Sequence, residues 1–419
     1  MQLSSEDKIN FSNIGLMLIT AVCAYFYPFE TFLLAYAYLG PLHYLTEISW
    51  LHDRNYFSKG KYDFLVLLIV GVLLSVAAFS KDFGFNTAFY DSFVSMNLFD
   101  KLLVFALFSS ILFALVQNLI IKIISILFLY VFVSGWLSPE NAAQQSENTA
   151  IFALTSLVPT LIHVYLFTGL FMLFGALKYR SKSGLWQMVG FVVIPLILVF
   201  YLPVNIKNSN LTEYGKNAYY AKGDGFFMTN VSIMDHFKLI DEPNLTNKQF
   251  LDSVVNNNKS GYPPEQRARI SDSLKGKLNQ DYIVENSRSE YFGRSIPLRY
   301  AIPVDVKNYF WDSVFFSTIG IMLMRFIAFA YMYHYLNWFS KTEVIKWHKV
   351  PKVRLIAIVV IWLAASIFYA YDYSLGLSLL FFLSFTHVLL EFPLNIFSIV
   401  GIGKETISIA KNGFSLKEK

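Results

Sequence analysis

The sequence predicts an all-α polytopic membrane protein with about ten transmembrane helices and a small extracytoplasmic α+β insertion. The chain of 419 residues is 55% hydrophobic and only 15% charged, whereas charged residues make up about a quarter of a soluble protein. Its mean hydropathy is +0.46. A water-soluble fold of this length could not hide 41 Phe and 26 Tyr behind so little charge, so we expect most of the chain to be surrounded by lipid.

The predicted spans are hydrophobic stretches of about 20 residues, the length that crosses a bilayer as a helix. The first stretch is not a cleavable signal, because Glu6 and Asp7 precede it and no small-residue cleavage site follows it. The ten stretches are 11–27, 30–50, 64–80, 101–117, 119–137, 150–177, 185–204, 309–338, 354–371 and 375–402.

The stretch from 101 to 137 is interrupted only by Gln117 and Asn118, and the positions of the basic residues predict two spans there rather than one. With two spans, the basic clusters named below all fall on one side, and the short connections 138–149 and 372–374 on the other side contain no Lys or Arg. The positive-inside rule then places both termini in the cytoplasm of a cell whose plasma (inner) membrane holds the protein. The basic residues concerned are Arg54, Lys59, Lys61, Lys178, Arg180, Lys182, Lys341, Lys346, Lys349, Lys352, Arg354 and the lysines from Lys404 onward.

Four regions follow from this topology: spans one to seven in 1–204, a polar extracytoplasmic domain in 205–307, spans eight to ten in 308–403, and a cytoplasmic tail in 404–419. Within the polar domain, Thr246 as an N-cap and Pro264 as a first helical residue predict helices over 247–257 and 264–279. Strand-like patches nearby predict a small α+β module. A partner protein in the cell envelope could bind there.

Several classes of function are excluded by composition. The single cysteine, Cys23, rules out intrachain disulfides and thiolate zinc sites. No haem or nucleotide motif is present, and no basic run with interleaved aromatic residues indicates a nucleic-acid partner. The seven histidines do not include the HxxxH boxes of membrane fatty-acid desaturases and hydroxylases, so those families are excluded as well.

Ionisable residues at bilayer depth are the candidates for function, since each costs several kcal/mol unless it is paired, ligated or hydrated. His43 and Glu47 stand four residues apart in the second span, and His387 and Glu391 repeat this spacing in the tenth. Residues four apart share one face of a helix. The sixth and eighth spans add the other intramembrane polar residues, which are His163, Arg325 and His334.

The four spans that carry these histidines all run from outside to inside, so the histidines can face one point. We therefore predict a transition-metal site with His43, His163, His334 and His387 as ligands, iron being favoured over zinc or copper. Glu47 and Glu391 would act as further ligands or as an acid and base, and Arg325 would hold the polar end of a substrate or neutralise a glutamate. His52 and His348 lie in interfacial or loop sequence and are expected to be solvated.

The resulting functional hypothesis is a membrane-embedded metalloenzyme, a non-haem iron oxygenase or hydroxylase acting on a lipid or isoprenoid. Its expected partners are membrane lipid and a lipophilic small molecule. Two alternatives remain at this stage. In the first, the protein is a proton-coupled transporter or flippase in which Arg325 pairs with Glu391. In the second, it is a non-enzymatic scaffold with a partner-binding external domain.

Overall fold

The computed structural model shows a predominantly helical protein. The part of the chain that the structure describes contains eight helices that are long and apolar enough to cross a membrane. The structure describes residues 4–82, 87–138, 148–206, 212, 214, 215, 218, 230, 232–234, 236–239, 246–256, 264–280, 288–291, 294–297, 313–341 and 345–414.

The chain folds into helices that follow the predicted spans closely. Several are interrupted by short segments of π-helix, labelled η. In chain order the main elements are α1 (Ser5–Phe26), α2 (Pro28–Leu34), η1 (Ala35–Leu39), α3 (Gly40–His52), α4 (Phe64–Asp82), α5 (Thr87–Ser95), α6 (Leu98–Leu115), α7 (Leu119–Trp136), α9 (Thr149–Phe152), η4 (Ala153–Phe167), α10 (Thr168–Lys178), α11 (Lys182–Leu196), η5 (Ile197–Tyr201), α17 (Thr318–Ser340), α19 (Lys352–Tyr371) and α20 (Tyr373–Asn412).

Two of the ten predicted spans are not among the eight candidate membrane helices. The predicted span 64–80 is α4, whose apolar part, Phe64–Ser80, is shorter than the others. The predicted span 30–50 lies within α2, η1 and α3, which follow one another without a break over 28–52, about 37 Å of helix. Its hydropathy is lowered by polar residues, and these include His43 and Glu47.

The predicted break between the fourth and fifth spans is confirmed. Helix α6 ends at Leu115, Val116 is extended, and the Asn118 side chain accepts hydrogen bonds from the backbone N–H groups of Ile120 and Ile121. Such an N-cap satisfies two of the amide groups that a helix start leaves unpaired. One asparagine therefore starts a new helix in the middle of an otherwise apolar stretch.

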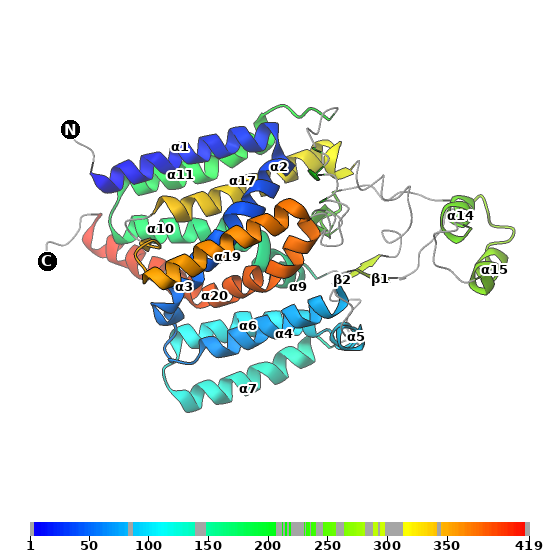
Figure 1. Ribbon diagram of the computed structural model, residues 1–419, viewed down its shortest axis with the longest axis horizontal. Helices are drawn as coiled ribbons and strands as arrows, with labels where there is room; N and C mark the ends of the chain where they lie inside the picture. Colours follow the sequence, from blue (N-terminus) through cyan, green and yellow to red (C-terminus); the bar gives the residue numbers. More distant parts are fainter. Residues whose placement is uncertain are drawn as a thin grey trace. The chain divides into compact units, whose positions relative to one another are not determined.

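Helix α20 lies at the centre of the bundle and packs against α3, α4, α6, α10 and α19 (Figure 1). At Gly71 of α4 an added Cβ would stand 2.9 Å from the Thr386 hydroxyl oxygen, so the absence of a side chain lets these two helices approach closely. α20 runs on to Asn412 and therefore includes the first part of the region that was predicted as a tail.

The ends of the helices that carry the basic connections lie together. Helix α1 begins and α20 ends at the same end of the bundle (Figure 1). Arg354 donates to Asp53 at 2.7 Å, which ties the start of α19 to the end of α3. Two further contacts at this end are Arg180 to Glu405 at 2.8 Å and Asn10 to Ser183 at 2.9 Å. The basic segments thus share one end, as the charge pattern predicts.

The chain divides into two units. One comprises 1–203, 210–224 and 322–419, and the other comprises 204–209 and 225–321. The described part of the second unit contains α14 (Asn247–Phe250) continued by η6 (Leu251–Val255), and α15 (Pro264–Ser273). Thr246 and Gln249 form a reciprocal capping box at the start of α14, so both predicted helix starts are confirmed. Two four-residue strands, β1 (Arg288–Tyr291) and β2 (Arg294–Pro297), pair in antiparallel register.

Candidate metal centre

Four histidines from four separate helical segments meet inside the bundle. His43 lies on α3, His163 on η4, His334 on α17 and His387 on α20. The four rings lie in a ring-shaped arrangement in which each is close to two others. The distances between ring centroids are 4.6 Å from His43 to His334, 5.1 Å from His334 to His163, 5.2 Å from His163 to His387, and 5.5 Å from His387 to His43. The structure therefore brings together all four predicted ligands.

His43 contacts two other residues of the cluster. Its Nε2 lies 2.9 Å from Oε2 of Glu47, one turn further along α3, and 3.0 Å from Nε2 of His334. The other ring nitrogen of His334, Nδ1, lies 2.7 Å from the hydroxyl oxygen of Thr168. The Thr168 hydroxyl donates its one proton to the carbonyl of Val164 at 3.0 Å, so it accepts from Nδ1–H of His334. The free lone pair of neutral His334 is then on Nε2 and faces His43.

The second carboxylate, Glu391, lies beside His163. Its Oε2 lies 3.4 Å from Nδ1 of His163. The carboxyl group of Glu47 and the side chain of Asn395 are also close to Glu391. Each glutamate thus lies beside a histidine. Glu47 contacts a histidine of its own helix, whereas Glu391 contacts a histidine of another helix.

These side chains are almost completely enclosed, and many of their polar atoms lack hydrogen bonds. The exposed fraction is between 1% and 6% for all six residues. Among the described residues, neither nitrogen of His163 or His387 and neither carboxylate oxygen of Glu391 makes a hydrogen bond of good geometry, although Glu391 lies close to His163, Glu47 and Asn395. Nδ1 of His43 and both side-chain polar atoms of Asn395 also lack one. A buried polar group without a partner costs roughly 1–3 kcal/mol, so this concentration of unpaired atoms calls for a bound group.

The geometry and chemistry of these atoms fit a metal ion. His43, Glu47 and His387 each offer a ligand atom, and the three atoms lie within 4.8 Å of one another. Ligands about 2.0–2.1 Å from one ion at right angles to each other are separated by about 3 Å, which agrees with the 2.9 and 3.0 Å contacts of His43 Nε2. The donors are nitrogen and oxygen only. This set suits iron, zinc or copper.

Irregular helix geometry surrounds the cluster. The π-helical segment η1 immediately precedes α3, and η4 carries His163 and includes Pro159. A proline inside a helix lacks the N–H that would bond to the preceding turn. π-Helical insertions rotate the residues that follow them and occur often at functional sites. Here they set the faces that His43 and His163 present.

A pair of tyrosines supports the cluster, and hydropathy alone did not predict it. Tyr44 stacks on the His387 ring with centroids 4.2 Å apart and an interplanar angle of 24°, and its hydroxyl lies 3.0 Å from that of Tyr335. The sequence His-Tyr-Leu occurs at both 43–45 and 334–336. The two histidines and the two tyrosines of this repeat contact each other. The repeated tripeptide was thus an available signal.

Arg325 does not join this cluster. Its guanidinium donates to the carbonyl of Pro203 at 2.9 Å and to that of Leu202 at 3.4 Å, and it lies 4.3 Å from the centroid of the Tyr25 ring. Along α17 it is nine residues, about 13 Å, from His334. It satisfies carbonyl groups just beyond the end of η5, and no contact with a glutamate is present among the described residues. His52 and His348 are exposed, as predicted.

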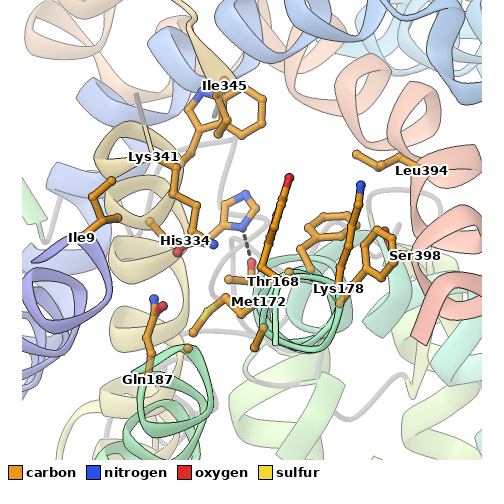
Figure 2. Close-up of a pocket in the computed structure, with 18 of the residues that line it drawn as sticks. Ile9, Thr168, Met172, Lys178, Gln187, His334, Lys341, Ile345, Leu394 and Ser398 are labelled. Atoms are coloured by element: carbon orange, nitrogen blue, oxygen red, sulfur yellow. Dashed lines mark hydrogen bonds between the residues drawn. The ribbon is translucent and has the colours of Figure 1, made fainter. Parts of the chain in front are cut away.

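A cavity of about 450 Å³ adjoins the cluster. His43, Glu47, His334 and Glu391 contribute to its wall. Figure 2 shows His334 and its hydrogen bond to Thr168, with Lys341 on one side of the space and Lys178 on the other. Most of the remaining wall is apolar and includes Trp50, Phe57, Phe171, Met172, Phe174, Trp338, Leu394 and Phe397. A volume of this size is typical of small-molecule sites.

No protein-family model, curated protein or solved structure shows significant similarity to this chain. Any functional assignment must therefore rest on the geometry of the site.

Proposed function

We propose that this protein is an integral membrane metalloenzyme, a non-haem iron oxygenase or hydroxylase that acts on a lipid or isoprenoid. The observation that carries the proposal is the convergence of four histidines and two glutamates whose buried nitrogen and oxygen atoms lack hydrogen bonds. One cation would satisfy several of these atoms together.

Iron is favoured over zinc and copper by the composition of the tightest group. His43, His387 and Glu47 are two histidines and one carboxylate, the ligand set that non-haem iron(II) oxygenases use while leaving other positions open. Iron bound there would supply the activation of dioxygen. His163 and His334 complete the proposed ligand set.

The remaining residues have separate tasks in this proposal. Thr168 holds the tautomer and the orientation of His334, as hydrogen-bond partners of ligand histidines commonly do. Glu391, beside His163 and on the cavity wall, is placed to accept or return a proton. The apolar wall excludes water and accepts a lipophilic substrate. Arg325 has a structural task, since it binds backbone carbonyls.

The orientation in the membrane follows from the shared basic end. We propose ten crossings, with α4 and the 28–52 helix as the two additional ones, in a plasma (inner) membrane. Both termini then lie in the cytoplasm and 205–307 outside, where an α+β module could meet an envelope partner. A cysteine introduced at Lys411 in a Cys23→Ala background should react with an impermeant reagent only in inverted vesicles. Reaction in right-side-out vesicles would reverse the orientation.

The enzymatic proposal is tested with purified protein loaded anaerobically with iron(II). The loaded protein is mixed with membrane lipid extract and isotope-labelled dioxygen, and the lipids are analysed by mass spectrometry. A two-electron reductant such as ascorbate is included, because insertion of one oxygen atom into a C–H bond requires two electrons and two protons to reduce the other atom to water. One labelled oxygen atom should then enter a lipid product, and the Glu47→Gln variant should form much less of it. Iron-loaded protein that incorporates no label into any lipid would refute the oxygenase assignment.

A second candidate function, a proton-coupled transporter or flippase, is favoured by a different observation. Thr168, His334, His43 and Glu47 form an unbroken chain of contacts between 2.7 and 3.0 Å, along which a proton could move. The version in which Arg325 pairs with Glu391 loses support from the contacts of Arg325 with Leu202 and Pro203. Proton flux through liposomes by metal-free protein would favour this function over the enzyme.

A further inference from the structure

The wall of the cavity beside the His/Glu cluster also carries charged residues. Lys178 and Lys341 both line the cavity, together with one acidic residue, Glu6. Lys178 is the last residue of α10, and Lys341 follows the last residue of α17. The cavity therefore runs from the His/Glu cluster to the end of the bundle where the basic segments gather.

Neither lysine has a carboxylate partner among the described residues. In the described part of the chain no ion pair within 4.0 Å involves Lys178 or Lys341. The Lys178 ammonium lies only near two rings of its own segment, 5.6 Å from the Phe174 centroid and 5.7 Å from that of Tyr179. Other basic residues at this end do have acidic partners, as Arg180 has Glu405 and Arg354 has Asp53. The two cavity lysines are thus available to an anion.

Apart from the charged residues and the cluster, most of the wall is apolar. It includes Phe171, Phe174, Leu394, Trp50 and Trp338, and uncharged polar side chains, among them Asn337 and Ser398, interrupt it. Lys341 is seven residues beyond His334, and Lys178 is ten residues beyond Thr168, which corresponds to about 10 and 15 Å of helix. A ligand that fills the cavity must therefore be polar and anionic at one end and hydrophobic along about 10–15 Å beyond it.

We infer that the substrate class of this site is an amphiphile with a single anionic head group, a carboxylate or a phosphate, held between Lys178 and Lys341 with its chain directed at the His/Glu cluster. The inference rests on the proposed function and deepens it. The reacting carbon is then several carbons away from the head group, not adjacent to it. A neutral isoprenoid or sterol would offer no charge to the partly buried Lys341 or to Lys178.

The burial of Lys341 supports this assignment. Removal from water lowers the pKa of Lys341 to about 8, because the charged form is the one that burial disfavours. A bound anion reverses this effect by stabilising the charge.

The test uses the two cavity tryptophans as reporters in a neutral maltoside detergent. Terminally brominated undecanoic acid, undecyl phosphate, undecanol and undecylamine are titrated, and bromine quenches tryptophan fluorescence on close approach. The part of the signal that is lost in a Trp50→Phe/Trp338→Phe variant belongs to the cavity. The acid or the phosphate should bind about tenfold or more tightly than the alcohol, and the tighter of the two identifies the head group.

The lysines are then tested directly. Lys178→Met/Lys341→Met should bring the affinity for both anions to that of the alcohol and leave the alcohol unchanged, while Lys182→Met, outside the cavity wall, should change neither. Equal binding of acid and alcohol, or tightest binding of the amine, would overturn the inference. Metal content is measured on the same samples. Metal-loaded protein without anion preference overturns only this inference, whereas metal-free protein with anion preference overturns the proposed function and leaves the substrate class supported.

Discussion

Replacement of Thr168 by valine tests how the histidine cluster is prepared for metal. The substitution preserves the shape of the side chain and removes one hydroxyl. That hydroxyl donates to the carbonyl of Val164 and accepts Nδ1–H of His334. It therefore holds the proton of His334 on Nδ1 and leaves Nε2 free to bind a cation. In Thr168→Val this control of the tautomer is lost.

The size of the effect follows from comparing the metal-free and metal-bound states. In the metal-free variant His334 can move its proton to Nε2 and donate it to Nε2 of His43, 3.0 Å away, so little is lost. With metal on Nε2 the proton must be on Nδ1, which is buried and now has no acceptor. An unsatisfied buried donor costs roughly 1–3 kcal/mol. We expect metal affinity to fall by about 10–100-fold, in the range that such substitutions produce elsewhere.

The assay is a competition titration of iron(II) or zinc(II) against a chelator of known affinity, in detergent. Thr168→Ser keeps the hydroxyl and should stay close to the wild type. Thr155→Val is the matched control, because Thr155 donates only to a carbonyl of its own helix, at 2.9 Å, and lies away from the cluster. Equal metal affinity in Thr168→Val and wild type would refute the role of this hydroxyl in orienting a ligand.

Three further predictions concern other parts of the bundle. Burial lowers the pKa of Lys341 to about 8, so its side chain loses its charge between pH 7 and pH 9, and anionic amphiphiles should bind more tightly at pH 7 than at pH 9. In Lys341→Met the affinity should change little with pH. A loss of affinity in that variant as large as in the wild type would show that another group is responsible. The ammonium group of Lys122 lies 2.6 Å from the buried Asp63 carboxylate, so Lys122→Met leaves that carboxylate without its cation and should lower the free energy of unfolding by about 3–5 kcal/mol. Arg354→Ala, which breaks an exposed pair, should lower it by under about 1 kcal/mol. Equal shifts of the melting temperature in the two variants would contradict this. Tyr44→Phe removes one hydroxyl-to-hydroxyl hydrogen bond and should cost about 1 kcal/mol in unfolding, with metal affinity kept because the stacked ring remains; loss of metal would show that the hydroxyl itself matters.

Hydropathy and charge predicted the helices well because lipid permits few alternatives to an apolar helix. The break at Asn118 was recognisable since a helix start needs an acceptor for its first amides. The second span was harder to establish. The polar residues that it contributes to the cluster, among them His43 and Glu47, also lower its hydropathy, so the segment that contributes two of the six cluster residues is among the least obvious as a membrane helix.

The members of the cluster were predictable from the cost of polar groups in lipid, but their contacts were not. Spacing of four residues placed His43 beside Glu47. It could not show that His334 would meet His43, since helix rotation and π-helical segments decide which residues face each other. Thr168 carried no sequence signal, because a threonine that bonds to its own helix is common in membrane spans.

Arg325 shows where the reasoning from the sequence was incomplete. A buried guanidinium was expected to need an anion, and the glutamates were the obvious candidates. Instead it binds the carbonyls of Leu202 and Pro203, which the end of η5 leaves without helical partners, and it faces the Tyr25 ring. Which helix end lies beside which side chain depends on packing that the sequence does not display.

The metal content of the purified protein tests the central claim most directly. Protein produced in medium with ample iron, zinc and copper and analysed by elemental mass spectrometry should carry close to one transition-metal ion per chain. His387→Ala should lose most of it, and His348→Ala, which changes an exposed histidine, should keep it. Folded wild-type protein that carries no metal and takes up none on reconstitution would contradict the account.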